Sequence, residues 1–114
     1  MATINPVRSS PGGAASKILW EGMATGDTIT PDLPSRSEPV GSVQVTGTFG
    51  GATVTLQGSN DGTNYVTLKD LSGADISFTT AGLAYFDGRT LYIRPGISGG
   101  SSDDVDVTVI YRGS

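Results

Sequence analysis

The chain contains no cysteine and no histidine among its 114 residues. Without cysteine it has no disulfide framework, no thiolate metal site and no thiol catalysis. Without histidine it lacks the commonest general base and the imidazole metal ligand. Charged residues make up only 16% of the chain, below the average of about 25%, which is not typical of a highly charged disordered protein. We therefore expect a folded protein that has no enzymatic activity and no cofactor.

Long apolar runs are also missing, since no stretch approaches the roughly 20 residues that span a bilayer. Residues 1–11 contain Pro6 and Pro11 and lack the apolar core of a signal peptide. The net charge is −4, whereas a nucleic-acid binder normally presents a basic face. The length fits one domain with a modest core. We expect neither a membrane nor a nucleic acid as partner.

The first 20 residues differ from the rest in charge. They contain Arg8 and Lys17 but no acidic residue, and all eleven carboxylates follow from Glu21 onward. Residues 1–16 are small, polar and rich in turn formers, with little to bury. The pattern predicts an extended N-terminal arm over residues 1–16 and a single domain over residues 17–114. The arm is either a plain polar tail or a segment that lies on an acidic neighbouring surface.

From Lys17 onward the sequence alternates with a period of two. Valine and isoleucine together number 16 against 7 leucines, and branched side chains suit a pleated, half-buried surface. No window has apolar residues at helical spacing over three turns. We expect seven or eight strands, near residues 18–20, 28–30, 43–49, 52–56, 66–68, 76–78, 91–95 and 105–111. The predicted fold is an all-β antiparallel sandwich, jelly-roll-like.

Turn residues suggest how these strands pair. Gly50 and Gly51 fit a two-residue hairpin turn, which would set Phe49 opposite Ala52, Gly47 opposite Val54 and Val45 opposite Leu56. The turn-rich residues 59–63 would extend this hairpin into a meander over residues 41–70, with Leu56 opposite Val66 and Val54 opposite Leu68. The loop over residues 98–104 would place Ile93 opposite Val109.

Three motifs suggest chemistry only weakly. Residues 96–100 match the Gly-x-Ser-x-Gly nucleophile pattern, but that pattern needs a following helix and a histidine, so a flexible loop is the better interpretation. Asp103, Asp104 and Asp106 could hold Ca²⁺ through oxygen ligands, although alternation puts Asp103 on the opposite face and favours a solvated loop end. Glu21, Asp27 and Asp32 are too scattered to predict a glycosidase pair.

Four large side chains are candidates for an interface. Tyr65, Tyr92 and Ile110 alternate to the face opposite the apolar row of their strands, where they are either exposed contact residues or covered by a second layer. Trp20 stands beside Ile18 and Leu19, a setting more typical of core than of interface. Residues 57–65 resemble a hairpin of discoidin-type carbohydrate-binding domains, and also hairpins common in phage virion β-domains.

From Val43 to Arg112 the chain resembles small structural proteins of tailed-bacteriophage virions, through its Val-Gln-Val-Thr-Gly-Thr-Phe and Ser-Asn-Asp-Gly-Thr-Asn-Tyr strands and turns. The resemblance implies a capsid decoration (cement) protein, made in the host cytoplasm and located on the outer capsid of the virion. It implies the major capsid (coat) protein as partner and a homotrimer as assembly. The arm residues expected to contact the coat or a neighbouring subunit are Ile4, Pro6, Val7, Arg8, Pro11 and Lys17. The alternatives are a carbohydrate-binding or adhesion module, and a neck, tail or head-fibre component.

Overall fold

The computed structural model describes residues 2–12, 15–33, 40–87 and 90–112, and every regular element in these ranges is a β-strand. The strands are β1 (Thr3–Ile4), β2 (Val7–Gly12), β3 (Ala15–Met23), β4 (Thr28–Ile29), β5 (Val40–Thr48), β6 (Thr53–Ser59), β7 (Val66–Thr67), β8 (Ser77–Phe78), β9 (Gly82–Asp87), β10 (Tyr92–Ser98) and β11 (Asp104–Arg112).

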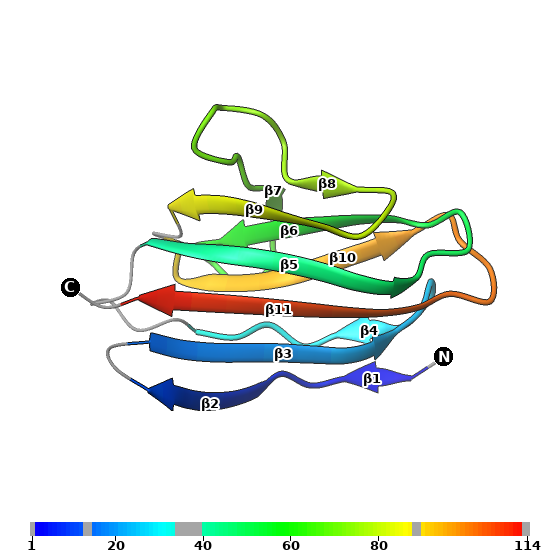
Figure 1. The fold of residues 1–114 in the computed structure, drawn as a ribbon, viewed down its shortest axis with the longest axis horizontal. Helices are drawn as coiled ribbons and strands as arrows, with labels where there is room; N and C mark the ends of the chain where they lie inside the picture. Colours follow the sequence, from blue (N-terminus) through cyan, green and yellow to red (C-terminus); the bar gives the residue numbers. More distant parts are fainter. Residues whose placement is uncertain (1, 13–14, 34–39, 88–89, 113–114) are drawn as a thin grey trace.

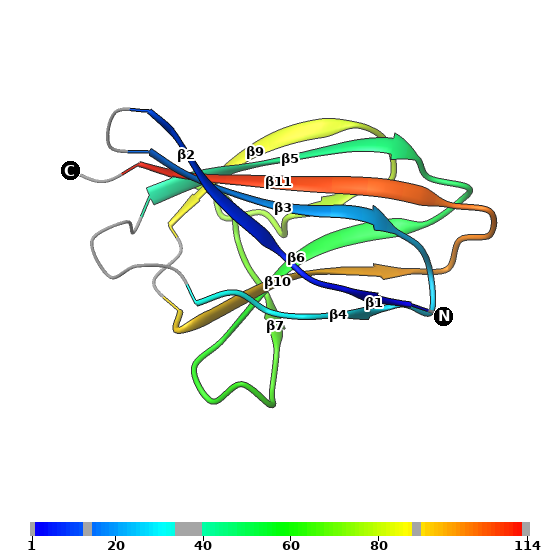
Figure 2. The same cartoon turned by 90° about the horizontal axis from the view of Figure 1, so that it is seen from below.

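Two sheets pack face to face, as Figure 2 shows from the side. The larger sheet has the order β2-β3-β11-β5-β9, and the smaller has the order β10-β6-β7 with β8 also paired to β6 (Figure 1). These pairs are all antiparallel, whereas the separate pair β1-β4 is parallel. The predicted all-β sandwich is confirmed.

The core lies between the two sheets and follows from the alternation in the sequence. The large sheet contributes side chains that are at most 1% exposed, and the small sheet faces them with Val54, Leu56 and Ile93 at the same burial. The buried residues of the large sheet are Ile18, Trp20, Met23, Val43, Val45, Phe86, Val105, Val107, Val109 and Tyr111. Burying this many branched and aromatic side chains is the main force holding the layers together.

The predicted hairpin at Gly50 and Gly51 is wrong in its pairing. A tight turn is present, with Ala52 N donating to Phe49 O at 2.8 Å, but β5 pairs with β11 and β9 while β6 pairs with β10. The chain therefore crosses from one sheet to the other at this turn. The physical reason is that β5 and β6 each carry an apolar row, and two such rows are better buried facing each other across the core than side by side.

The connection between β10 and β11 is a second crossing of the same kind. We expected Ile93 opposite Val109 in one sheet, but β10 belongs to the small sheet and β11 lies between β3 and β5 in the large one. Both residues are fully buried, so the prediction identified their apolar faces correctly and their pairing incorrectly.

The meander prediction is partly right. β6 and β7 do pair, but Gly58 stands opposite Val66 and Gln57 opposite Thr67, two residues further along than expected. A shift of two residues keeps every side chain on its predicted face. Leu68 N donates to Leu56 O at 2.8 Å, and Leu68 packs against the core. β9 has no counterpart among the predicted strands.

Residues 2–12 belong to the domain and do not form the predicted separate arm. β1 pairs with β4, and β2 pairs with β3 as an edge strand of the large sheet. The segment crosses from beside the small sheet to the large one, the dark-blue strand that runs obliquely in Figure 2. Its composition offers little to bury, and main-chain bonds to β3 and β4 hold it instead.

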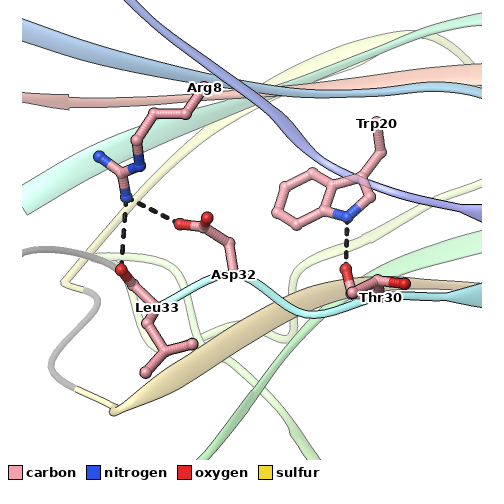
Figure 3. A network of polar contacts seen from close by, with 5 residues as sticks. All are labelled: Arg8, Trp20, Thr30, Asp32 and Leu33. Atoms are coloured by element: carbon pink, nitrogen blue, oxygen red, sulfur yellow. Dashed lines mark hydrogen bonds and ion pairs between the residues drawn. The ribbon is translucent and has the colours of Figure 1, made fainter.

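Polar contacts hold β2 and β3 to the segment that follows β4. The Arg8 guanidinium donates to Asp32 Oδ2 at 2.7 Å, and the Trp20 indole nitrogen donates to the main-chain oxygen of Thr30 at 2.8 Å (Figure 3). Asp32 also exchanges two main-chain hydrogen bonds with Ile93 of β10. Residues 30–32 therefore link the two sheets along this side of the sandwich.

Candidate functional site

The outer face of the large sheet is a broad surface that no other described segment covers (Figure 2). Strand register aligns its side chains in rows that cross all five strands. One row runs through Val7, Leu19, Thr108, Gln44 and Leu83, and the next through Ser9, Lys17, Ile110, Ser42 and Tyr85. Val7 and Leu83 are the two ends of the first row, and Ile110 and Tyr85 are the middle and the β9 end of the second.

The loop before β8 extends this surface beyond β9. Leu71 N donates to Tyr85 O at 3.0 Å, and Asp70 forms a bridge with Phe86, so Leu71 lies beside Tyr85 on the same face. We call Val7, Leu19, Ile110, Leu83, Tyr85 and Leu71 the apolar band. Four of these six are strongly exposed, namely Val7 (63%), Leu71 (66%), Leu83 (53%) and Tyr85 (58%). Exposed apolar groups gathered on one face indicate a contact surface.

The band has a hollow at its β9 end. An open depression of about 300 Å³ is lined by Asp70, Leu71, Ser72, Leu83, Ala84 and Tyr85. Asp70 Oδ1 accepts bonds from the main-chain nitrogen and hydroxyl of Ser72 and from Ala74 N. These bonds, the Ser72 hydroxyl first, hold the pKa of Asp70 below its usual value. The leucine and tyrosine side chains therefore give the hollow an apolar lining, and the Asp70 carboxylate fixes the turn beside it.

The aspartates near the start of β11 do not assemble into a cation site. Asp106 Oδ1 accepts from Gly22 N at 2.9 Å, and Asp103 Oδ2 accepts from Thr25 N at 3.0 Å and from its hydroxyl at 2.6 Å. Asp106 thus binds the end of β3, and Asp103 binds the loop between β3 and β4. Among the described residues no cluster of three acidic side chains is arranged to hold a metal ion.

The outer face of the small sheet is polar and carries a second depression. The Arg94 guanidinium stacks over the Tyr65 ring, 3.7 Å from its centre, and Arg94 Nε donates to Gln57 Oε1 at 3.2 Å. An open groove of about 410 Å³ runs from here past Gly96 to Thr28 of β4. A side chain at position 96 would meet Gln57 Nε2 at 2.7 Å, so glycine keeps the groove open.

The four predicted interface residues separate onto different parts of the molecule. Ile110 lies in the apolar band, whereas Tyr65 and Tyr92 are half-buried on the opposite side of the sandwich, Tyr92 against Gly62. Trp20 is fully buried, which corrects its place among the interface candidates, because its ring fills the core and its indole nitrogen is bonded to Thr30.

The six predicted arm contacts are also divided. Ile4 packs against the core, Pro6 is half-buried, and Arg8 is paired with Asp32. Val7 and Lys17 lie on the outer face of the large sheet, one row apart. Pro11 belongs to β2. Val7 and Lys17 therefore face outward from the large sheet, and the Pro11 side chain lies outside the described part of the chain.

Sequence reasoning missed three of the four strongly exposed members of the band, Leu71, Leu83 and Tyr85. Leu83 and Tyr85 alternate with Ala84 and Phe86, which is the period-two signal of a strand with one buried and one exposed face. That signal was available in the sequence. The position of Leu71 was not, because it depends on a loop closing onto β9.

No protein-family profile matches the chain, and no curated protein is detectably similar to it in sequence. Among solved structures, the SPBc2 prophage-derived protein YomS is similar over 90% of this chain and 98% of its own, with a TM-score of 0.58 at 13% identity. Protein NMB1881 from Neisseria meningitidis covers 95% of this chain and 82% of its own, with a TM-score of 0.40 at 9% identity. The likeness to YomS shows a shared fold. No described helix is long and apolar enough to cross a membrane.

Proposed function

We propose that this chain is a non-enzymatic structural protein of a phage particle, a capsid decoration protein that binds the coat protein. The observation that carries the proposal is the apolar band on an uncovered sheet face. The fold of a prophage-derived protein, YomS, supports a phage origin, and the acidic net charge fits a protein that does not bind DNA. The protein would act on the outer capsid after synthesis in the host cytoplasm.

The small area of the band explains why such a protein would bind tightly only to a repeating capsid shell. Two rows about 7 Å apart, crossing five strands spaced about 4.8 Å, cover roughly 300–400 Å² of flat area. A stable interface buries about 800 Å² on each partner, so one copy alone would bind weakly. A symmetric assembly on a repeating shell multiplies such contacts and makes occupancy tight.

The test is the number of copies that bind to particles from the source phage lacking this protein. We expect hundreds of copies per particle by quantitative mass spectrometry, seen as regular surface knobs by electron microscopy. The substitution Gln44→Lys puts a charge in the middle of the band at an exposed position and should reduce occupancy about tenfold or more. The matched control is Ser77→Lys, an exposed strand position on the small sheet, which should bind normally.

Two results would contradict the proposal. A few copies at one vertex would indicate a neck, tail or head-fibre component. Equal occupancy of Gln44→Lys and Ser77→Lys would show that the band is not the contact surface.

A carbohydrate-binding or adhesion role is the second candidate, because of the groove beside Arg94. Its Thr55, Gln57 and Ser98 side chains could bond sugar hydroxyls, and Arg94, which stacks on the Tyr65 ring, also lines it. A glycan-array screen separates the two candidates. Specific hits that Arg94→Ala abolishes would favour the carbohydrate-binding role.

A further inference from the structure

We infer that the groove on the outer face of the small sheet binds an acidic sugar, whose carboxylate pairs with the Arg94 guanidinium. The inference names the ligand class for the carbohydrate-binding candidate and rests on that candidate, and it does not depend on the apolar band. The evidence for it is the setting of Arg94, the arrangement of charge along the groove and the chemistry of the groove lining.

The Arg94 guanidinium is held in place by two contacts that leave its terminal nitrogen atoms available. The group stacks over the Tyr65 ring, 3.7 Å from the ring centre, and its Nε donates to Gln57 Oε1 at 3.2 Å. Neither Nη1 nor Nη2 has a hydrogen bond or an ion pair with a described residue. These two atoms form the end of a planar fork that matches the two oxygens of a carboxylate. Arg94 therefore has the geometry of a preformed anion site.

The loop that precedes Tyr65 is itself fixed, and its acid does not neutralise Arg94. Asp61 accepts hydrogen bonds from the main-chain nitrogens of Thr63 and Asn64, each at 2.8 Å, and from Asn64 Nδ2 at 2.9 Å. The Asp61 carboxylate therefore holds its own loop together. A half-buried cation with no acidic partner among the described residues favours an anion from outside the chain.

The segment that contains β4 runs alongside β10, as Figure 2 shows. Asp32 pairs antiparallel with Ile93 at the start of β10. Just beyond the other end of the strand, Gly100 N donates to Thr25 Oγ1 at 3.0 Å. Asp27, which also lines the groove, therefore lies toward the C-terminal end of β10.

The groove therefore has a positive end and a negative end. Arg94 is the first lining residue on β10 and Ser98 is the last, about 13 Å further along the strand. Toward the Ser98 end, the two oxygens of the Asp27 carboxylate accept hydrogen bonds from Ala2 N and Ala24 N, each at 2.9 Å. An anionic ligand is therefore favoured with its carboxylate at Arg94 and its uncharged part toward Ser98.

The lining of the groove suits sugar hydroxyls better than a peptide. Thr55 and Gln57 offer hydroxyl and amide groups, and the volume of about 410 Å³ lies within the range of roughly 300–1,000 Å³ typical of ligand sites. An extended peptide would instead add as a strand to the edge of β10. The main-chain groups of Ile93 on that edge are already bonded to Asp32, and Pro95 has no N–H to donate.

The test is a glycan array that includes uronic and sialic acids, each beside its neutral and its methyl-esterified counterpart. We expect the chain to bind carboxylated glycans, and to bind the neutral and esterified forms about tenfold or more weakly. Added salt should weaken the binding, because the ion pair is only partly buried. The side-chain NMR signals of Arg94 Nε and of the Gln57 amide should shift on titration with the strongest hit.

Three variants test where the ligand binds. Arg94→Gln removes the charge and should lower the affinity about tenfold or more, and Arg94→Lys, which lacks the planar fork, should restore only part of that loss. Gly96→Ala places a Cβ 2.7 Å from Gln57 Nε2, so it should weaken binding with no change of charge. The matched control is Lys69→Gln, the same change of net charge at a cation that pairs with Asp75 outside the groove lining, and it should bind normally. Unfolding midpoints of all variants check that the fold is intact.

Several outcomes would overturn the inference. These are no binding to any carboxylated glycan, equal binding of the methyl esters, or full affinity of Arg94→Gln. Hits confined to neutral glycans would leave the carbohydrate-binding candidate standing and overturn the acidic ligand. Binding of a glutamate-rich peptide at Arg94 in place of any glycan would also overturn it, because the ligand would then be an acidic protein segment.

Capsid occupancy distinguishes the failure of this inference from the failure of the decoration role. A chain that decorates capsids but binds no acidic glycan would refute this inference alone. A chain that binds acidic glycans but no capsid would refute the decoration role alone.

Discussion

The crossing between β5 and β6 can be tested by two neighbouring glycine substitutions. Gly50 and Gly51 both have positive φ, 57° and 85°, and both are exposed. They differ in what surrounds them. A side chain at position 50 would meet the main-chain oxygen of Ser101 at 2.1 Å, whereas at position 51 the nearest atom, the oxygen of Gly99, is 4.0 Å away. The loop after β10 therefore packs against one glycine and leaves the other open.

The expected costs follow from these contacts. Alanine at either position has a positive φ, which costs about 1–2 kcal/mol. In Gly50→Ala the new Cβ also overlaps the main-chain oxygen of Ser101. One of the two turns must move to relieve this overlap, which costs about 1–3 kcal/mol more. We expect Gly51→Ala to lower the free energy of unfolding by about 1–2 kcal/mol and Gly50→Ala by about 2–5 kcal/mol. The φ of Gly51 lies farther from the usual left-handed value of about 57°, so alanine is more strained at position 51 than at position 50. The measured difference between the two variants therefore understates the cost of the overlap at position 50.

Urea unfolding measures both variants against the original chain. Far-UV circular dichroism reports the sheets, and fluorescence of Trp20, the single tryptophan, reports the core. Coincidence of the two transitions would support two-state analysis. The slope with urea should stay constant, because the surface exposed on unfolding is unchanged.

Equal costs for the two substitutions, within about 0.5 kcal/mol, would refute the argument. That result is expected of an isolated hairpin, in which both turn glycines point into solvent and differ only in backbone strain. A larger cost at position 51 would be equally damaging. A larger cost at position 50 than at position 51 is expected only if the turn packs against the loop between β10 and β11.

Three further predictions follow from buried or charged groups. Trp20→Phe removes the donor to Thr30 and part of a fully buried ring, so it should lower the free energy of unfolding by about 2–4 kcal/mol. Urea unfolding followed by circular dichroism measures this loss, and a value below about 1 kcal/mol would contradict the prediction. Hydrogen bonds from Asn64 and Thr63 hold the pKa of Asp61 far below its usual value. The Asp61 carboxylate should therefore contribute fully to the free energy of unfolding above about pH 4, and this contribution should be lost as the pH falls toward the folded-state pKa. Asp61→Asn should flatten that fall in acid urea titrations, and an unchanged slope would show that the loop does not contribute. The Tyr65 hydroxyl is buried with no hydrogen-bond partner among the described residues, so Tyr65→Phe removes an unpaired polar group and should raise the unfolding free energy by about 1 kcal/mol. Tyr65→Ala removes the ring beneath Arg94 and should lower it by about 1–3 kcal/mol.

The sequence predicts the faces of strands better than their partners. The alternation in β5, β6 and β11 correctly identifies the buried residues, including Val43, Val54 and Val107. Alternation is a property of one strand, and it does not say whether a neighbouring strand lies beside it or across the core. A hairpin and a sheet crossing bury the same side chains, so the period-two pattern at residues 43–56 fits both.

Alternation within single strands also makes part of the apolar band predictable from the sequence. Ile110 follows from the alternation in β11, and the same reasoning applied to Gly82–Asp87 would have found Leu83 and Tyr85. The hollow itself was not predictable, because Leu71 reaches β9 through a loop whose course depends on bonds to Tyr85 and Phe86. Such long-range closure leaves no local pattern in the sequence.

The N-terminal segment shows why composition misleads at a sheet edge. Residues 2–12 have few apolar side chains, yet they are held by the pairing of β1 with β4 and β2 with β3. Deleting them would remove an edge strand and the Arg8–Asp32 contact together, so a truncated chain would confuse lost docking with lost stability. Alternation along β2 separates the two roles, since Arg8 turns inward to Asp32 while Val7 turns outward. One polar strand can therefore hold the sandwich together with one face and meet a neighbour with the other, and substitutions at Val7 test the second role without disturbing the first.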